Sequence, residues 1–358
     1  MINTKNKKRN IILTLGLIAV VLLAAHFANG LIDSYTRRVL NLCAIYTIVA
    51  LSMNLVNGFA GMFSLGQAGF MAIGAYVVAI FTVPVSVRPD IFYTVPMAPF
   101  LVNIYFPLLP ALFLGGLLAA LVAFLIGFPV LRLRGDYLAI ATLGFSEIIR
   151  IVFTNIQSIT NGPMGIKNIP LTSNMFVFYL AAVITVIILA LLLSSSFGRA
   201  FKAIREDDIV SEAIGIGLFK HKLMAFVIGG FFAGFGGGLY ATFLGTVDPK
   251  NFMFVQTFLF LLIIVLGGLG SISGTVMSAF IVVSGLELLR VFDEPLPIHI
   301  PLISELFRPG LRMVIFSLLL MLLVLFWQKG IMGKTELSWD RVFGWFNKLS
   351  SRKGGTAK

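Results

Sequence analysis

The sequence predicts an all-α fold, a polytopic bundle of membrane-spanning helices. Of its 358 residues, 58% are hydrophobic and only 12% are charged, about half the charge of a typical soluble domain. The apolar residues gather in stretches that approach the roughly 20 residues a helix needs to cross a bilayer. Because a water-soluble fold of this size would lack the polar residues to cover its surface, the composition excludes a cytosolic enzyme, a secreted module and a disordered chain.

Ten stretches qualify as spans. In chain order they cover residues 11–29, 38–57, 67–83, 107–128, 137–155, 175–194, 223–243, 254–270, 272–290 and 310–327. The first follows a basic N-terminus but is longer than the core of a secretory signal, so we interpret it as an uncleaved helix. Small, polar residues over 57–66 predict that the second or third span is broken or re-entrant. The Gly-rich sequence 267–274 predicts a tight helical hairpin or a helix broken inside the membrane.

Charge distribution predicts the orientation. If the N-terminus is cytoplasmic, 18 of the 27 Lys and Arg residues fall in inside segments and 7 in outside segments, which favours both termini inside. The expected regions are a basic cytoplasmic N-terminal tail (1–10), a transmembrane permeation domain (11–328) and an amphipathic, basic cytoplasmic C-terminal tail (329–358). The same bias explains the net charge of +12 through lipid-facing loops, so nucleic acid is not an expected partner.

The chain shows no motif for a bound cofactor. Cys43 is its single cysteine, and its three histidines are scattered, so no metal-ligand spacing is present. The phosphate-binding pattern Gly-x-x-x-x-Gly-Lys-Ser/Thr is also missing. We therefore expect neither a metal nor a nucleotide on this chain.

One polar segment between the sixth and seventh spans is too regular for a loop. Phe201, Ile204, Ile209 and Ala213 recur at near-helical spacing, and glycines follow at the end. The pattern predicts an amphipathic cytoplasmic helix over about 199–217. It leaves two interpretations open: a helix lying on the membrane surface, or one that docks in a groove of a soluble partner.

Four segments carry a resemblance to a known family. Residues 198–215 resemble the cytoplasmic loop of ABC-importer permeases, with a degenerate Glu-Ala-x-x-x-Gly motif at Glu212-Ala213-Ile214-Gly215. Residues 54–70, 132–150 and 267–274 resemble permeases of branched-chain amino-acid importers, and the likeness covers about 35–330. The run Arg132-Leu133-Arg134-Gly135-Asp136-Tyr137 looks like the second of two related permease subunits.

The resemblance implies a permease subunit in the bacterial inner membrane that translocates Leu, Ile or Val and is not itself an enzyme. Its implied partners are a sister permease in a heterodimer, two cytoplasmic ATPase subunits that bind the ATP, and an extracytoplasmic solute-binding protein. The implied ATPase-coupling residues are Arg199, Lys202, Ile204, Arg205, Glu206, Asp208, Glu212, Ala213 and Gly215. The alternatives are a permease of the same family for urea, short amides or another small solute, and a secondary transporter driven by an ion gradient.

Polar side chains within or beside the spans are candidates for the solute pathway. Each is either hydrogen-bonding glue between helices or part of a wet path, where unwound backbone exposes carbonyls and amides to a passing zwitterion. Glu147 lies one helical turn before Arg150, so it is either a paired structural charge or an element of the gate. The candidate pathway residues are Asn54, Asn57, Ser64, Gln67, Thr142 and Glu147.

Two further patterns predict packing. Gly230, Gly234 and Gly238 share one helix face at intervals of four, which is typical of close helix–helix contact. Glu287 and Arg290 repeat the three-residue spacing near an outer helix end, and we interpret them as a structural pair.

Overall fold

The computed structural model describes residues 4–133 and 135–290, together with positions 314, 317–318, 321–322, 325–326, 330–333 and 336–337. Over these residues the chain is helical, and its β pairing is limited to an isolated antiparallel bridge between Ile166 and Val247. Most of the predicted tenth span (310–327) and of the C-terminal tail (329–358) lies outside the described residues, as do the first three residues of the N-terminal tail.

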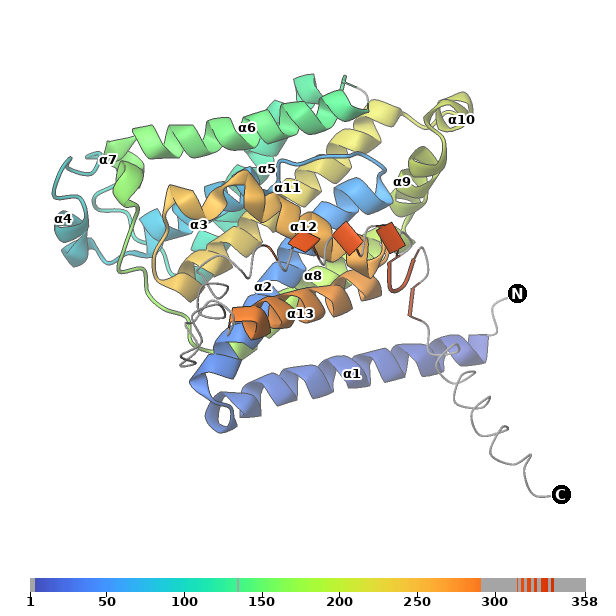
Figure 1. The fold of residues 1–358 in the computed structure, drawn as a ribbon, viewed down its shortest axis with the longest axis horizontal. Helices are drawn as coiled ribbons and strands as arrows, with labels where there is room; N and C mark the ends of the chain where they lie inside the picture. The colour runs from blue at the N-terminus through green and yellow to red at the C-terminus, as the bar shows by residue number, and fades with distance from the viewer. Residues whose placement is uncertain are drawn as a thin grey trace, which may run out of the picture.

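Nine of the predicted segments coincide with helices (Figure 1). These are α1 (Thr4–Leu31), α2 (Ser34–Asn54), α3 (Gln67–Thr82), α5 (Leu108–Val130), α6 (Asp136–Asn155), α8 (Met175–Ser194), α11 (Leu218–Leu244), α12 (Phe254–Gly267) and α13 (Ile272–Leu288). Short helices connect them: α4 (Arg88–Ile91), α7 (Gln157–Thr160), α9 (Ser196–Glu206) and α10 (Asp208–Ala213). A π-helical turn, η1 (Leu55–Phe59), and three 3₁₀ turns, η2 (Val85–Val87), η3 (Gly162–Met164) and η4 (Pro249–Phe252), complete the chain.

The count of ten spans is not reached in the described part of the chain. Six helices there are long and apolar enough to cross a membrane, and a seventh span results if α3 is joined to the segment Val85–Ile91, which is bent from it by 97°. α12 and α13 are apolar but shorter than this length. The reason is that the backbone leaves the helical path at the two places where the sequence is rich in small residues, 60–66 and 268–271.

The second break is a tight hairpin, one of the two arrangements expected from 267–274. α12 and α13 pack against each other, and the Ser278 hydroxyl donates to the Ile263 carbonyl at 2.5 Å. Gly268 and Gly270 adopt φ of +109° and +85° in the connection, which only glycine enters without strain.

α11 forms the centre of the bundle and packs against α2, α3 and α5. A Cβ added to Gly230 would lie 2.6 Å from the Cβ of Ala123, and one added to Gly238 would lie 2.6 Å from Val78 Cγ2. A Cβ on Gly234 would overlap Ala119 and approach the Gly115 carbonyl at 2.9 Å. The predicted small-residue face is therefore confirmed, because it allows α5 and α11 to approach closely.

α1 stands apart from this core. It packs mainly against α8. Only 6% of its most apolar stretch of 18 residues is buried, compared with 89% of the corresponding stretch in the span that begins with α2. A groove of about 980 Å³, lined largely by apolar side chains, runs between α1 and the helices α2, α8 and α13.

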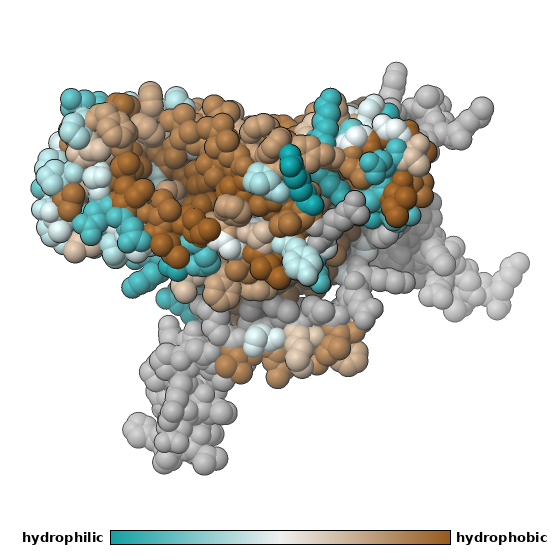
Figure 2. All heavy atoms as spheres, turned by 90° about the horizontal axis from the view of Figure 1, so that it is seen from above, coloured by the Kyte–Doolittle hydropathy of each residue, from teal (hydrophilic) through white to brown (hydrophobic). Residues whose placement is uncertain are grey.

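The hydropathy of the surface changes along the long axis of the molecule. Figure 2 shows a broad apolar band in the middle of one face, with hydrophilic residues gathered towards both ends. One end carries α9 and α10, and the other carries α4 and α7 (Figure 1). An apolar band between two polar ends is the arrangement that a bilayer requires.

Candidate functional site

The break between α2 and α3 is held in a fixed shape by Asn57. Its Nδ2 donates to the Ser64 carbonyl at 3.0 Å, and its Oδ1 accepts from the Ser64 amide at 3.2 Å. The π turn before it and the extended stretch after it leave backbone groups outside a regular helix. Such backbone persists at membrane depth only where protein or a wet cavity covers it, and Ser64 itself is 1% exposed.

Asn54 connects this break to the second one. Its side chain is fully buried, and its Nδ2 donates to the Ser271 carbonyl (3.0 Å) and to Thr275 Oγ1 (2.6 Å). Its Oδ1 accepts from the Gly270 amide at 2.9 Å. With these three bonds, Asn54 anchors the end of α2 to the α12–α13 turn.

Two threonines hold the other side of the break. Thr142 Oγ1 on α6 accepts from the Leu65 amide at 2.9 Å. Thr257 Oγ1 on α12 accepts from the Ala68 amide at 3.2 Å. Sequence reasoning missed Thr257, since a threonine in an apolar run is ordinarily a small packing residue. Together the two hydroxyls complete backbone hydrogen bonding where α3 begins.

Gln67 differs from these anchors. It is 2% exposed, and its Oε1 has no hydrogen-bond partner among the described residues. Ser146 Oγ, which is buried on the neighbouring α6, is likewise unpartnered. A buried acceptor that makes no hydrogen bond lowers the stability of a protein by about 1–3 kcal/mol. Gln67 therefore presents an acceptor that a passing donor could use.

Glu147 occupies a different position. Its Oε2 accepts from Arg150 Nε at 2.7 Å, and its Oε1 accepts from the Phe254 amide at the start of α12 at 3.3 Å. Both carboxylate oxygens are thus engaged: Oε2 within α6, and Oε1 in a contact that joins α6 to α12. This geometry is that of a paired structural charge rather than of a free carboxylate in a path.

The segment predicted to be cytoplasmic forms two helices, α9 and α10, in place of the single helix expected over 199–217. Asp207 has extended backbone (φ −158°, ψ 116°), and its Oδ1 accepts from the Ile209 and Val210 amides at 2.8 and 3.0 Å. An aspartate that caps the following helix in this way ends the preceding one.

The predicted apolar stripe is therefore wrong as a single face. Phe201 and Ile204 on α9 are buried, at 0% and 3% exposed, whereas Ile209 on α10 is 79% exposed. Val210 and Ile214 are also exposed, at 56% and 69%. α9 faces the bundle, and α10 presents apolar side chains outward.

Apart from Arg205, the remaining predicted coupling residues are exposed. The Arg199 guanidinium donates to Ser196 Oγ at 3.0 Å, and Asp208 forms an ion pair with Lys222 Nζ at 2.5 Å. The other exposed members are Lys202, Glu206, Glu212, Ala213 and Gly215.

Arg205 on α9 connects the predicted coupling segment, which consists of α9 and α10, to both helix breaks. Its Nη1 donates to the Gly58 carbonyl of the π turn at 3.0 Å, while its Nη2 pairs with Glu206 Oε1 at 2.8 Å. A Cβ on Gly61 would lie 2.9 Å from Arg205 Cα, and one on Gly270 would overlap the Arg205 guanidinium. The structure thus brings together two residue groups that the sequence places in separate segments, with Arg205 at their junction.

No cluster suited to a metal is found within the described ranges. There, no three His, Cys, Asp or Glu side chains gather closely enough to hold an ion. The site consists instead of hydrogen-bonded backbone, amides and one guanidinium, which suits binding and movement rather than bond chemistry.

Comparison with known proteins places these features in a family. The family model described as "Branched-chain amino acid transport system / permease component" matches residues 35–325. The chain is 37% identical over 314 residues to the high-affinity branched-chain amino acid transport system permease protein LivM of Escherichia coli K12. The matched region covers 78% of this chain and 69% of that protein. It is 38% identical over 286 residues to LivM of Salmonella typhimurium LT2, covering 70% of this chain and 62% of that relative.

A more distant relative is the nucleoside ABC transporter permease protein NupC of Lactococcus lactis. It is 23% identical over 296 residues, covering 77% of this chain and 87% of that protein. No solved structure matches the chain.

Proposed function

The chain belongs to the family of permease components of branched-chain amino acid transport systems, and from this premise we propose that it forms the membrane path for Leu, Ile or Val in an ATP-driven importer. Members of this family are transport subunits, and the ATPase lies on separate chains. The observation that carries the proposal is the contact of Arg205, in the predicted coupling segment, with the broken helices of the predicted path.

The complete transporter in this proposal contains a sister permease, two cytoplasmic ATPase subunits and an extracytoplasmic solute-binding protein. The chain lies in the bacterial cell membrane, and the proposal keeps both termini inside and ten spans, with the tenth predicted from sequence at 310–327. The charge bias of the sequence and the two polar ends of the surface support this orientation.

α10 is the element that would meet an ATPase. Ile209, Val210 and Ile214 form an exposed apolar group, and Glu212 lies on the same short helix. A helix with projecting apolar anchors fits a hydrophobic groove on a soluble partner. The buried face of α9 holds α10 to the membrane bundle, so a push on α10 is transmitted rather than absorbed.

The transmission step runs through Arg205. Movement of α9 would shift the guanidinium against Gly58, in the π turn that precedes the first break, and against Gly270, in the non-helical turn between α12 and α13. Turns without regular helical hydrogen bonds can change shape at lower cost than helices, and broken helices of this kind are typical of alternating access.

The path itself is proposed to pass the break at 60–67. Gln67 is its best-supported solute contact, because its Oε1 is buried and unpartnered. Asn57 and Thr142 shape the backbone there, with Ser64 buried beside them. Asn54 and Glu147 act in this proposal by holding α12 and α13 in place, since their polar atoms already have partners.

An ion-gradient mechanism finds less support. It would require a relay of unpaired intramembrane charges, whereas Glu147 is paired with Arg150. The family match also favours ATP-driven transport for this chain.

The test is ATP-dependent uptake by the reconstituted complex with α10 altered. Ile209→Asp places a charge on the exposed apolar group without touching the core, so uptake of leucine and co-purification of the ATPase subunits are expected to fall at least about tenfold, the effect of losing one interface anchor. Ile209→Leu is the matched control and should behave as the unchanged protein. Full uptake by the Asp variant would refute docking through α10, and absence of ATP-dependent leucine uptake by the unchanged complex would refute the proposed function.

A further inference from the structure

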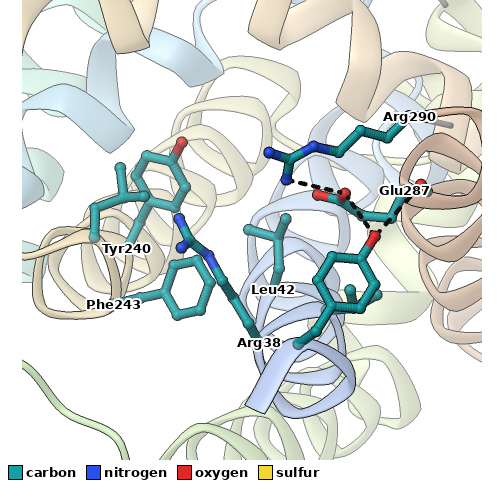
Figure 3. Close-up of a pocket in the computed structure, with 9 residues that line it drawn as sticks. Arg38, Leu42, Tyr240, Phe243, Glu287 and Arg290 are labelled. Atoms are coloured by element: carbon teal, nitrogen blue, oxygen red, sulfur yellow. Dashed lines mark hydrogen bonds and ion pairs between the residues drawn. The ribbon is translucent and has the colours of Figure 1, made fainter. Parts of the chain in front are cut away.

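A small pocket lies at the end of the bundle opposite the coupling segment. It has a volume of about 100 Å³ and lies between the first turns of α2 and the last turns of α11 and α13 (Figure 3). α2 runs from this pocket to the π turn that contacts Arg205, and α11 runs to it from the residues that follow α10. In the proposed orientation, this is the extracytoplasmic mouth of the permease.

The pocket carries charges of both signs on opposite walls. Arg38 lies over the Phe243 ring at 5.7 Å, and the structure gives it no ion pair among the described residues. Glu287 faces it from the other side, with Leu42 between the two groups (Figure 3). A cation without a carboxylate partner, bordering the same cavity as a carboxylate, can bind the negative end of a ligand whose positive end meets Glu287.

Glu287 is only loosely held. Its Oε2 accepts from the Tyr35 hydroxyl at 3.3 Å and lies 3.9 Å from Arg290 Nη1, too long for a hydrogen bond. Its Oε1 has no hydrogen-bond partner in the described part of the chain. The expected structural pair with Arg290 is thus a long contact, and one carboxylate oxygen remains available for a donor.

The rest of the lining combines Tyr35, Tyr240 and Arg290 with apolar side chains. Val39 and Leu42 on α2 and Phe243 and Leu244 on α11 contribute aliphatic and aromatic surface. One water needs roughly 10–15 Å³ of such space, so about 100 Å³ accommodates a solute several times larger. Arg290, beside Glu287, gives the lining a second cation. Arg38 can bind a carboxylate and Glu287 an ammonium group, so a small zwitterion with an apolar side chain engages both signs of charge and the apolar wall, whereas a simple anion or cation engages only one sign.

We propose that this pocket is an extracytoplasmic binding site for a free aliphatic α-amino acid, with Arg38 binding its carboxylate, Glu287 binding its ammonium group and Leu42 and Phe243 contacting its side chain. The inference rests on the proposed function, because it names a first site for the same solute on the permease. It also adds a point of selectivity on this chain. An ethanolamine lipid headgroup shares the combination of ammonium and anion, so the test must separate the two sources.

The experiment measures equilibrium binding to the full permease–ATPase complex in lipid nanodiscs of phosphatidylcholine and phosphatidylglycerol, without the solute-binding protein. The probes are L-leucine, 4-methylpentanoate, which lacks the ammonium group, and 3-methylbutylamine, which lacks the carboxylate. We expect Arg38→Gln to weaken binding of leucine and 4-methylpentanoate about tenfold and to leave 3-methylbutylamine unchanged, because only carboxylates lose a charge-assisted hydrogen bond. Glu287→Gln should weaken binding of leucine and 3-methylbutylamine about tenfold and leave 4-methylpentanoate unchanged, because only ammonium groups lose a charge-assisted hydrogen bond.

Arg37→Gln is the matched control. Arg37 is the neighbouring cation on α2, but its guanidinium donates to the Asn29 carbonyl (3.1 Å) and to Ser34 Oγ (3.4 Å), and it does not line the pocket. This variant should bind all three probes as the unchanged complex does. Basal ATP hydrolysis and elution volume should match in all variants.

Several results would overturn the inference. The pocket would have only a structural role if Arg38→Gln bound leucine as well as Arg37→Gln does. The same conclusion would follow if both pocket variants weakened the binding of all probes equally. Loss of leucine binding on adding phosphatidylethanolamine to the nanodiscs would assign the pocket to a lipid headgroup. If the unchanged complex imports leucine but does not bind it without the binding protein, the pocket fails while the proposed function stands.

Discussion

Arg88 shows how burial can reverse the expected role of a single residue. By sequence it counts among the outside loop charges, yet it is 2% exposed. Its guanidinium donates six hydrogen bonds to backbone carbonyls, including those of Ile80 at 3.1 Å, Leu101 at 2.5 Å and Ile104 at 2.6 Å. A planar guanidinium serves several carbonyls at once, which a lysine ammonium cannot do in the same geometry. Arg88 therefore fixes the loop that connects α3 to α5.

Replacing this residue tests that role. Arg88→Lys should destabilise the protein by about 3 kcal/mol, because several buried carbonyls lose their donor. A melting temperature lower by at least ~5 °C in detergent would be the corresponding signal. Arg132→Lys, at an exposed position where the guanidinium lies over the Phe128 ring, should melt as the unchanged protein does. Equal melting of the two variants would contradict the assignment.

Gln67 provides a second test at the scale of one residue. Because its Oε1 makes no hydrogen bond among the described residues, Gln67→Leu should change the free energy of unfolding by no more than about 1 kcal/mol. Leucine uptake should nevertheless fall if the amide contacts the solute. The measurements are the melting temperature and the rate of uptake at saturating binding protein. A variant that melts much earlier would instead identify Gln67 as glue between helices.

At the scale of elements, close approach of α5 and α11 explains why glycine recurs along α11. The faces meet so closely that added side-chain atoms at Gly230, Gly234 or Gly238 would overlap α5 or α3. The sequence spacing alone predicted this packing, because residues four apart lie on one face of any α-helix. By contrast, the division of the coupling segment into α9 and α10 followed from one aspartate that caps α10, and the periodic pattern did not detect it.

Gly234→Ala tests the packing of α5 against α11. The new Cβ would overlap Ala119 and crowd the Gly115 carbonyl, so destabilisation of about 1–3 kcal/mol is expected from overpacking. The control is Gly144→Ala on α6, where an added Cβ meets nothing within 4 Å. That change should be neutral or slightly stabilising, since alanine favours helix more than glycine does. Thermal melting of both variants would distinguish a packing effect from a general intolerance of substitution.

At the scale of the whole molecule, Arg205 connects α9 to the two helix breaks. Arg205→Gln removes the bond to the Gly58 carbonyl while leaving the exposed apolar group on α10 intact. The ATPase subunits should therefore still bind, but uptake per ATP hydrolysed should fall about tenfold, within the usual range of coupling free energies. Arg199→Gln is the control: its guanidinium lies on the same helix but donates to Ser196 Oγ, so this variant should keep normal coupling. Normal uptake by the Arg205 variant would show that coupling takes another route.

The sequence by itself determined the membrane class, nine helical segments in the described chain, the small-residue face of α11 and the family. These properties follow from composition and from spacing within single segments, and neighbouring residues carry that information. Only the tertiary structure decided which polar side chains are engaged and which remain available. Arg205 and Gly58 are 147 residues apart, and Asn54 and Gly270 are 216 apart. Contacts over such separations depend on how the helices pack together, and no local pattern records them.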